Sequence, residues 1–102
     1  METHKAKRVA IIIEEPMERR LTAALDGAGV QGYSILPVLG GSGRSGGWTA
    51  DGQLGRSGMR QVVCIIRPER LDDLLTAAFK VVDRHMGVVT VSDCDVLRAE
   101  RF

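Results

Sequence analysis

Glycine is distributed very unevenly along this chain. Eight of its twelve glycines lie between Gly40 and Gly58, in a stretch without apolar periodicity. Aliphatic segments, residues 9–38 and 62–97, flank that stretch on both sides. A loop of this length within a small domain usually has a function or is disordered. We therefore expect the flanking halves to form the framework and residues 40–60 to form a mobile functional loop.

Length and charge limit the classes of protein to which the chain can belong. Its 102 residues suit one domain, residues 1–102, with a flexible N-terminus at residues 1–7. The formal net charge is only +1, which argues against binding to nucleic acid or a membrane surface through charge alone. The chain start lacks the apolar segment of a signal peptide, and no apolar run approaches the roughly 20 residues of a membrane-spanning helix. We expect a cytoplasmic protein without membrane insertion or a nucleic-acid partner.

Apolar periodicity predicts the same order of elements in both halves. Each half begins with a β-branched strand, continues with an amphipathic helix that opens at a proline, and ends with a second strand. Glycines follow both helices, at Gly27 or Gly29 and at Gly87. The predicted strands are Arg8–Glu14, Tyr33–Leu39, Gln61–Arg67 and Val88–Leu97, and the predicted helices begin at Pro16 and Pro68.

The two halves are also related in sequence. Residues 21–25 read LTAAL and residues 75–79 read LTAAF, and the same offset places Ile11-Ile12 on Ile65-Ile66. Two strand–helix–strand units in tandem predict an α+β, ferredoxin-like (βαβ)2 sandwich, an antiparallel sheet with both helices on one face. The other face would expose alternate apolar side chains, which usually marks an oligomer interface. A ring of three subunits is a natural closed arrangement of such sheets.

The glycine-rich stretch contains a literal dinucleotide-binding pattern. Residues 41–46 read GSGRSG, but the GWTADG sequence that follows cannot start the helix that the pattern requires. A Walker A loop is excluded because no Lys-Ser or Lys-Thr pair follows the glycines. The glycines can still present backbone N–H groups to an anion, and Arg44 adds a bidentate donor for phosphate or carboxylate. A flexible, solvated loop is the alternative.

The chain lacks a residue pattern typical of catalysis or metal binding. Ser92 and Cys94 alternate with carboxylates along a predicted strand, but neighbours on a strand point to opposite faces. Cys64 and Cys94 lie in separate apolar runs, which favours two reduced, buried thiols. The two histidines are not clustered. We expect neither an enzyme nor a metal site.

Together these features resemble the PII superfamily of trimeric signalling proteins, and more specifically its PII-like branch associated with bicarbonate transporters and carboxysomes. The resemblance covers nearly the whole chain, and its motifs are Gly32-Tyr33-Ser34, Gly40-Gly41-x-Gly43 with a nearby arginine, and Gly87-Val88-Val89. It implies a homotrimer with three clefts between subunits, each binding an adenine nucleotide. The glycine-rich stretch would be the T-loop, whose conformation reports the ligand to a partner.

The resemblance also implies the residues of the site. Ile12, Ser34 and Ile66 would frame the adenine. The ribose and phosphates would be bound by Gly40, Gly41, Arg44, Ser45, Gly87, Val88, Arg98 and Arg101. Bicarbonate, the second ligand that such relatives suggest, would suit an arginine fork at Arg44 or Arg98. Trp48, Arg56 and Arg60 would offer contacts to a partner protein.

The chain departs from nitrogen-regulatory PII at three places. Its loop has no tyrosine that could be uridylylated, the glutamine at the loop base is missing, and the turn Arg84–Gly87 is short and contains no lysine for the outer phosphates. These departures predict a preference for AMP, ADP or cyclic AMP over ATP, and they argue against a response to 2-oxoglutarate.

The leading hypothesis is a non-enzymatic sensor in inorganic-carbon metabolism, with a bicarbonate transporter or a carboxysome-related protein as its partner. Three alternatives remain: nitrogen-regulatory PII, a divalent-metal-binding trimer of the copper-tolerance type, and an RNA-binding ferredoxin-like module. The last would display aromatic side chains on its first and third strands, where this chain has none.

Overall fold

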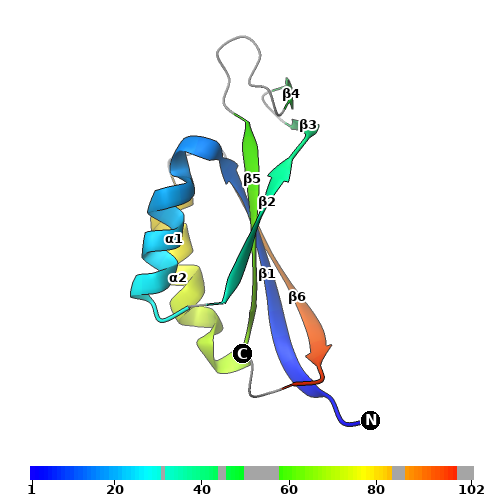
Figure 1. The fold of residues 1–102 in the computed structure, drawn as a ribbon. Helices are drawn as coiled ribbons and strands as arrows, with labels where there is room; N and C mark the ends of the chain where they lie inside the picture. The colour runs from blue at the N-terminus through cyan, green and yellow to red at the C-terminus, as the bar shows by residue number, and fades with distance from the viewer. Residues whose placement is uncertain (31, 44–45, 50–57, 84–86, 99–102) are drawn as a thin grey trace.

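Two helices cover one face of a four-stranded antiparallel sheet (Figure 1). The structure is a computed structural model that describes residues 1–30, 32–43, 46–49, 58–83 and 87–98, without the side chains of residues 43 and 46–49. In the order in which they lie side by side, the strands are β2 (Tyr33–Val38), β5 (Met59–Ile66), β1 (His4–Glu14) and β6 (Gly87–Val96), and the helices are α1 (Glu18–Gly27) and α2 (Leu71–Val82). This arrangement confirms the predicted α+β, ferredoxin-like fold.

Prolines set the start of both helices, as the sequence predicts. Pro16 lies in a short 3₁₀ turn, η1 (Glu15–Met17), that runs into α1. Pro68 lies in the corresponding turn, η3 (Pro68–Arg70), before α2. Proline is tolerated there because the first N–H groups of a helix have no partner within it.

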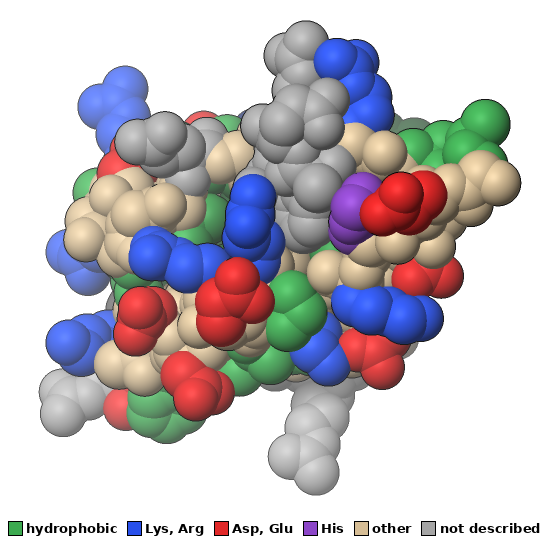
Figure 2. All heavy atoms as spheres, turned by 90° about the horizontal axis from the view of Figure 1, so that it is seen from below, with side chains coloured by type: hydrophobic (Ala, Val, Ile, Leu, Met, Phe, Trp, Pro, Cys, Tyr) green, Lys and Arg blue, Asp and Glu red, His purple; other side chains and the backbone are tan. Residues whose placement is uncertain are grey.

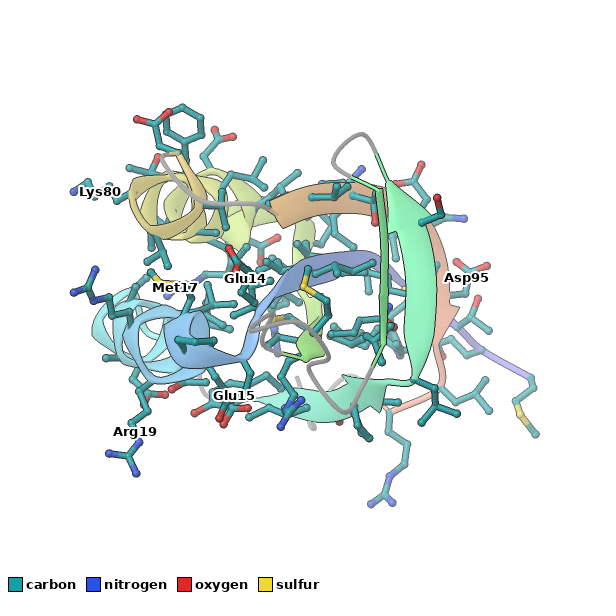
Figure 3. The ribbon with its side chains drawn as sticks, turned by 90° about the horizontal axis from the view of Figure 1, so that it is seen from above. Glu14, Glu15, Met17, Arg19, Lys80 and Asp95 are labelled. Atoms are coloured by element: carbon teal, nitrogen blue, oxygen red, sulfur yellow. The ribbon has the colours of Figure 1, made fainter. Side chains whose placement is uncertain are left out.

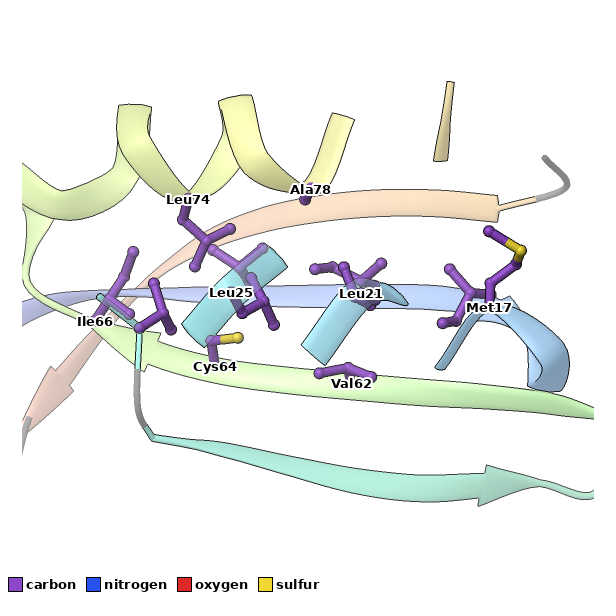
Figure 4. Close-up of a cluster of buried hydrophobic side chains, with 12 residues drawn as sticks. Met17, Leu21, Leu25, Val62, Cys64, Ile66, Leu74 and Ala78 are labelled. Carbon is purple, nitrogen blue, oxygen red and sulfur yellow. The ribbon is translucent and has the colours of Figure 1, made fainter. Parts of the chain in front are cut away.

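The core lies between the two helices and the sheet (Figure 4). Every second residue of the central strands faces the helices and is almost completely buried, which follows from the alternation of side chains along a strand. The largest of these buried side chains are Val9, Ile11 and Ile13 of β1, Val62 and Cys64 of β5, Leu21 and Leu25 of α1, and Leu74 of α2. Burial of one such aliphatic side chain contributes roughly 1.5–3 kcal/mol.

The two cysteines differ in their surroundings. Cys64 is completely buried, and burial raises the pKa of its thiol to about 11, so that it stays protonated at neutral pH. Cys94 is also a free thiol, but it is only half-buried on the uncovered face of β6. The prediction of a buried thiol is therefore confirmed for Cys64, whereas Cys94 is more exposed than predicted.

The face of the sheet away from the helices remains uncovered in one chain. It carries the alternate residues of each strand, and its side chains are mainly apolar. Leu36 on β2 and Val88 on β6 are 44% and 56% exposed, and Ile12, Val63 and Ile65 between them are half-buried. We call this surface the open face.

The first strand begins earlier than the sequence analysis predicted. Residues 4–7, expected to belong to a flexible N-terminus, are part of β1 and pair with the end of β6. Ala6 is 1% exposed, and Lys7 binds Asp93 on the neighbouring strand at 2.5 Å. The lysine hydrogen bond holds the pKa of the Asp93 carboxyl below its ordinary value. The charged side chains of Lys5, Lys7 and Arg8 interrupt the apolar pattern there, so the sequence does not reveal this extension.

Part of the glycine-rich stretch forms regular structure. Strands β3 (Gly40–Gly43) and β4 (Gly46–Thr49) pair with each other in a separate two-stranded sheet, which we call the hairpin. It lies at the end of the molecule opposite the N-terminus, on the side of the sheet away from the helices (Figures 1 and 3). The stretch ends at Met59, where β5 begins two residues earlier than predicted.

The internal repeat is not reproduced in the packing. Leu21 and Leu25 of α1 are buried, whereas Leu75 of α2 is half-buried and Phe79 is 61% exposed. The buried positions of α2 are instead one residue earlier, at Leu74 and Ala78. The matching residues of the two halves therefore do not occupy equivalent positions in the core.

Candidate functional site

The end of the sheet below the hairpin brings several predicted site residues together. Ile12 lies opposite Val88 in the β1–β6 register, and its other neighbour, Gln61, lies opposite Leu36. These four side chains form one row across the open face. With three aliphatic members out of four, the row offers an apolar platform on which a flat ring could pack.

Gly87 fits tightly at the start of β6. A Cβ atom at this position would lie 3.0 Å from the carbonyl oxygen of Ile12 and 3.5 Å from side-chain atoms of Ile13 and Val82. Because backbone cannot yield as a flexible side chain does, a larger residue here would displace β6 from β1. Gly87 therefore sets how closely Val88 approaches Ile12.

Gly40 and Gly41 begin the hairpin at this same end of the molecule. Both are exposed, and only Leu39 separates them from the end of β2. Glycine leaves the backbone N–H groups open to close approach by a ligand. An anion held there would lie at the end of the sheet that carries Ile12 and Val88.

Ser34 and Ile66 are placed differently from one another. Ser34 is exposed on the open face, and the β2–β5–β1 register places it level with Ala10, two residues below Ile12. Ile66 is 6% exposed and packs into the core under the helices, because β5 turns Val62, Cys64 and Ile66 to that side. The neighbouring residue Ile65, not Ile66, lies on the open face. We therefore leave Ile66 out of the candidate site.

Arg98 lies at the opposite end of the molecule from Gly87. It follows β6, whose ten residues span about 33 Å at the rise of an extended strand. Arg98 is exposed and already has an interaction partner. At this end, Lys and Arg side chains are interspersed with Asp and Glu (Figure 2). Within one chain, Arg98 and the hairpin end cannot contact the same small ligand.

The remaining predicted residues fall into two groups. Arg44, Ser45, Arg56 and Arg101 lie outside the described residues, as do Arg84, His85 and Met86. The backbone of Trp48 lies in β4, opposite Gly41.

Arg60 differs from its expected place in the loop. It is the second residue of β5 and points to the helix side of the sheet, where its Nε lies 3.4 Å from Oε1 of Glu18. Its Nη1 also donates to the carbonyl oxygen of Met59 at 3.2 Å. Next to this pair, the backbone N–H of Glu15 donates to the carbonyl oxygen of Gly58 at 2.8 Å. Figure 3 shows Glu15 beside the start of α1.

The ion pair and the Glu15–Gly58 hydrogen bond join residues more than forty positions apart, and no periodic pattern in the sequence links Glu18 to Arg60. The one signal was that Arg60 directly precedes the third predicted strand, whose residues 62–66 are all apolar.

Two open grooves lie elsewhere on the chain. One, of about 560 Å³, lies between the helices and is lined by small residues such as Ala24, Gly27 and Ala77. The other, of about 450 Å³, is lined by Leu75, Phe79 and Val89. Neither contains a predicted site residue.

Among the described residues, no three His, Cys, Asp or Glu side chains form a group that could hold a metal ion. Within that same part of the chain, no helix is long and apolar enough to cross a membrane.

Comparison with known proteins gives a consistent result. The family Nitrogen regulatory protein P-II matches residues 6–101 of the chain. Among curated proteins, no sequence match was found. A structure of CPII from Thiomonas intermedia K12, a nitrogen regulatory PII-like protein bound to ADP, AMP and bicarbonate, is similar with a TM-score of 0.87 and 28% identity, over 99% of this chain and 96% of that chain.

Two further structures show the same likeness. CPII from the same organism, bound to ADP and bicarbonate, has a TM-score of 0.86 and 31% identity, over 99% of this chain and 97% of that chain. A PII-like signalling protein from Thermus thermophilus has a TM-score of 0.77 over 100% of this chain and 99% of that chain, but at 22% identity its likeness concerns the fold alone.

Proposed function

Because this chain belongs to the Nitrogen regulatory protein P-II family, we propose that it is a PII-like signalling protein whose ligand is an adenine nucleotide, with AMP or ADP preferred over ATP. Proteins of this family are trimers that bind nucleotide effectors. The observation that carries the proposal is the likeness, at 31% identity over 99% of the chain, to a protein bound to ADP and bicarbonate.

The geometry supports a site that two protomers share. The glycines of the hairpin and the row containing Ile12 and Val88 lie at one end of the sheet, whereas Arg98 lies at the other. A site that uses both groups needs the hairpin end of one protomer and Arg98 of the next. In this arrangement the apolar row packs against the adenine, and the glycine N–H groups together with Arg98 bind the phosphates.

Calorimetric titration with AMP, ADP, ATP and cyclic AMP tests the preference. The turn at residues 84–87 contains no lysine that could meet the outer phosphates, so we expect AMP or ADP to bind more tightly than ATP. Equal or tighter binding of ATP would contradict this argument. Failure of every adenylate to bind would overturn the proposal itself.

Replacement of Arg98 tests the shared site. Arg98→Ala removes charge-assisted hydrogen bonds worth about 1.5–3 kcal/mol in total, so the affinity for ADP should fall roughly ten- to hundredfold. Arg19→Ala is the matched control, because Arg19 points away from the body of the protein on α1 (Figure 3). An Arg98→Ala protein with the affinity of the control would remove Arg98 from the site.

We extend the proposal to a second ligand and a partner protein. Bicarbonate suits an arginine fork at Arg44 or Arg98, and CPII provides the precedent of a relative bound to it. The loop would then relay ligand state to a bicarbonate transporter or a carboxysome-related protein through Trp48 and Arg56. Calorimetric titration of bicarbonate into the ADP-loaded protein tests the first step, and absence of heat beyond dilution would exclude it.

A further inference from the structure

The two ends of the glycine-rich stretch are attached to the domain in different ways. At its C-terminal end, Gly58 accepts a hydrogen bond from the backbone of Glu15, and Arg60 pairs with Glu18 in the first turn of α1. Met59 between them is 4% exposed. These contacts connect the point where the stretch enters β5 to the start of α1, and we call them the α1 latch.

The N-terminal end has no comparable attachment among the described residues. The last β2–β5 pair joins Val38 to Met59, and Leu39 beyond it is 80% exposed. Within the described chain, Gly40 and Gly41 then pair with Thr49 and Trp48 of β4. Because this ladder holds both glycines in the hairpin, Leu39 is the residue at which the hairpin can rotate relative to the main sheet.

We propose that the α1 latch holds the C-terminal end of the stretch in place, so that the hairpin reorients by rotation about Leu39. Glu18 is the positioning residue of this device, because it orients Arg60 from a different element. A ligand that binds the backbone of Gly40 and Gly41 then changes the direction of the hairpin relative to a fixed point. This last step rests on the proposed function, whereas the latch itself does not.

Partial exposure weakens the ion pair of the latch. The side chains of Arg60 and Glu18 are 29% and 32% exposed, so solvent screens part of their attraction. Glu18 also lies in the first turn of α1, where a negative charge interacts favourably with the helix dipole. A control must therefore separate the ion pair from the general effect of negative charge in this turn.

Hydrogen exchange of the Glu15 amide reports directly on the latch, because this N–H donates to Gly58. In the ligand-free protein, we expect Glu18→Gln to increase its exchange rate about two- to fivefold, as for loss of a partly exposed ion pair. The amide of Ile11, in the middle of β1, should not change, which separates local opening from global destabilisation.

Glu15→Gln is the matched control. It removes an equal charge one turn earlier but keeps the backbone N–H that bonds Gly58. We expect the protection factor of the amide at position 15, which corrects for the intrinsic exchange rate of each residue type, to stay as in the unmodified protein. Exchange in the double variant Glu18→Arg with Arg60→Glu should be slower than in either single reversal. Unchanged exchange in Glu18→Gln, or no recovery in the double variant, would overturn the latch.

The ligand-dependent step has its own measurement. Trp48 is the only tryptophan of the chain, so its fluorescence anisotropy with and without ADP reports on the hairpin alone. We expect ADP to change the anisotropy of the unmodified protein and to change that of Glu18→Gln less. An equal change in both proteins would overturn the transmission step. If no adenylate binds to either, the proposed function fails, while the exchange result still decides the latch.

Discussion

Gly29 ends α1 in a backbone conformation that other residues adopt only with strain. Its φ is 83°, and its N–H donates to the carbonyl oxygen of Asp26, while the N–H of Val30 donates to that of Leu25. This is the Schellman arrangement, which satisfies the last carbonyls of a helix. Arg70 reinforces it by donating from Nη2 to the carbonyl oxygen of Ala28 at 2.6 Å.

Gly29→Ala should destabilise the protein more than Gly27→Ala. A Cβ at position 29 would meet Nη2 of Arg70 at 2.5 Å, and the left-handed conformation costs an L-residue about 1–2 kcal/mol. Gly27 is the control because it lies within α1 and a Cβ there meets nothing within 4 Å, so alanine should be neutral or stabilising. Urea denaturation of both variants measures the difference, and equal midpoints would contradict this description of the helix end.

At the scale of elements, β1 and β6 form the longest strand pair of the sheet. Their register runs from His4 opposite Val96 to Ile13 opposite Gly87. Lys5 and Lys7 bind Asp95 and Asp93 across the pair. Residues 4–7 therefore belong to the domain itself.

Deletion of residues 1–7 tests this conclusion. Loss of several ladder hydrogen bonds, at about 0.5–1.5 kcal/mol each, should lower the free energy of unfolding by at least about 2 kcal/mol. Deletion of residues 1–3, which precede β1, should leave it nearly unchanged. If both truncated proteins unfold at the same denaturant concentration, the extended strand does not contribute to stability.

The sequence predicted most of the elements and their order because the signals are local. Pro16 and Pro68 mark the helix starts, Gly29 marks a helix end, and the β-branched runs mark the strands. The fold followed from the order of these elements, since two strand–helix–strand units have few ways to share one core.

Local sequence signals predict only part of the candidate site. The resemblance implies Ile66 as an adenine contact, but side chains alternate along β5, which places Ile66 in the core and Ile65 on the open face. The pairing of Arg60 with Glu18 depends on how the start of α1 lies over β5, which no local pattern reports.

At the scale of the whole molecule, the open face is an apolar surface that a single chain leaves uncovered. Leu36 and Val88 are exposed there, and no element of the described chain covers the apolar residues between them. The family is trimeric, and in a trimer this face would be buried against neighbouring protomers. The same association would bring Arg98 of one protomer to the hairpin end of another.

Leu36→Asp should therefore give a folded monomer. Leu36 lies on edge strand β2 and is 44% exposed, so aspartate is tolerated within one chain but not in an apolar interface. Ala23→Asp, on an exposed position of α1, should leave the trimer intact. Sedimentation velocity measures both, and a trimeric Leu36→Asp protein would show that the open face is not the interface.

The measurement that tests the shared nucleotide site most directly is native mass spectrometry of the protein mixed with ADP. We expect three chains with up to three ADP molecules for the unmodified protein, and no ADP on single chains that dissociate from it. Monomers that retain ADP, or trimers that never acquire it, would contradict a site built from two protomers.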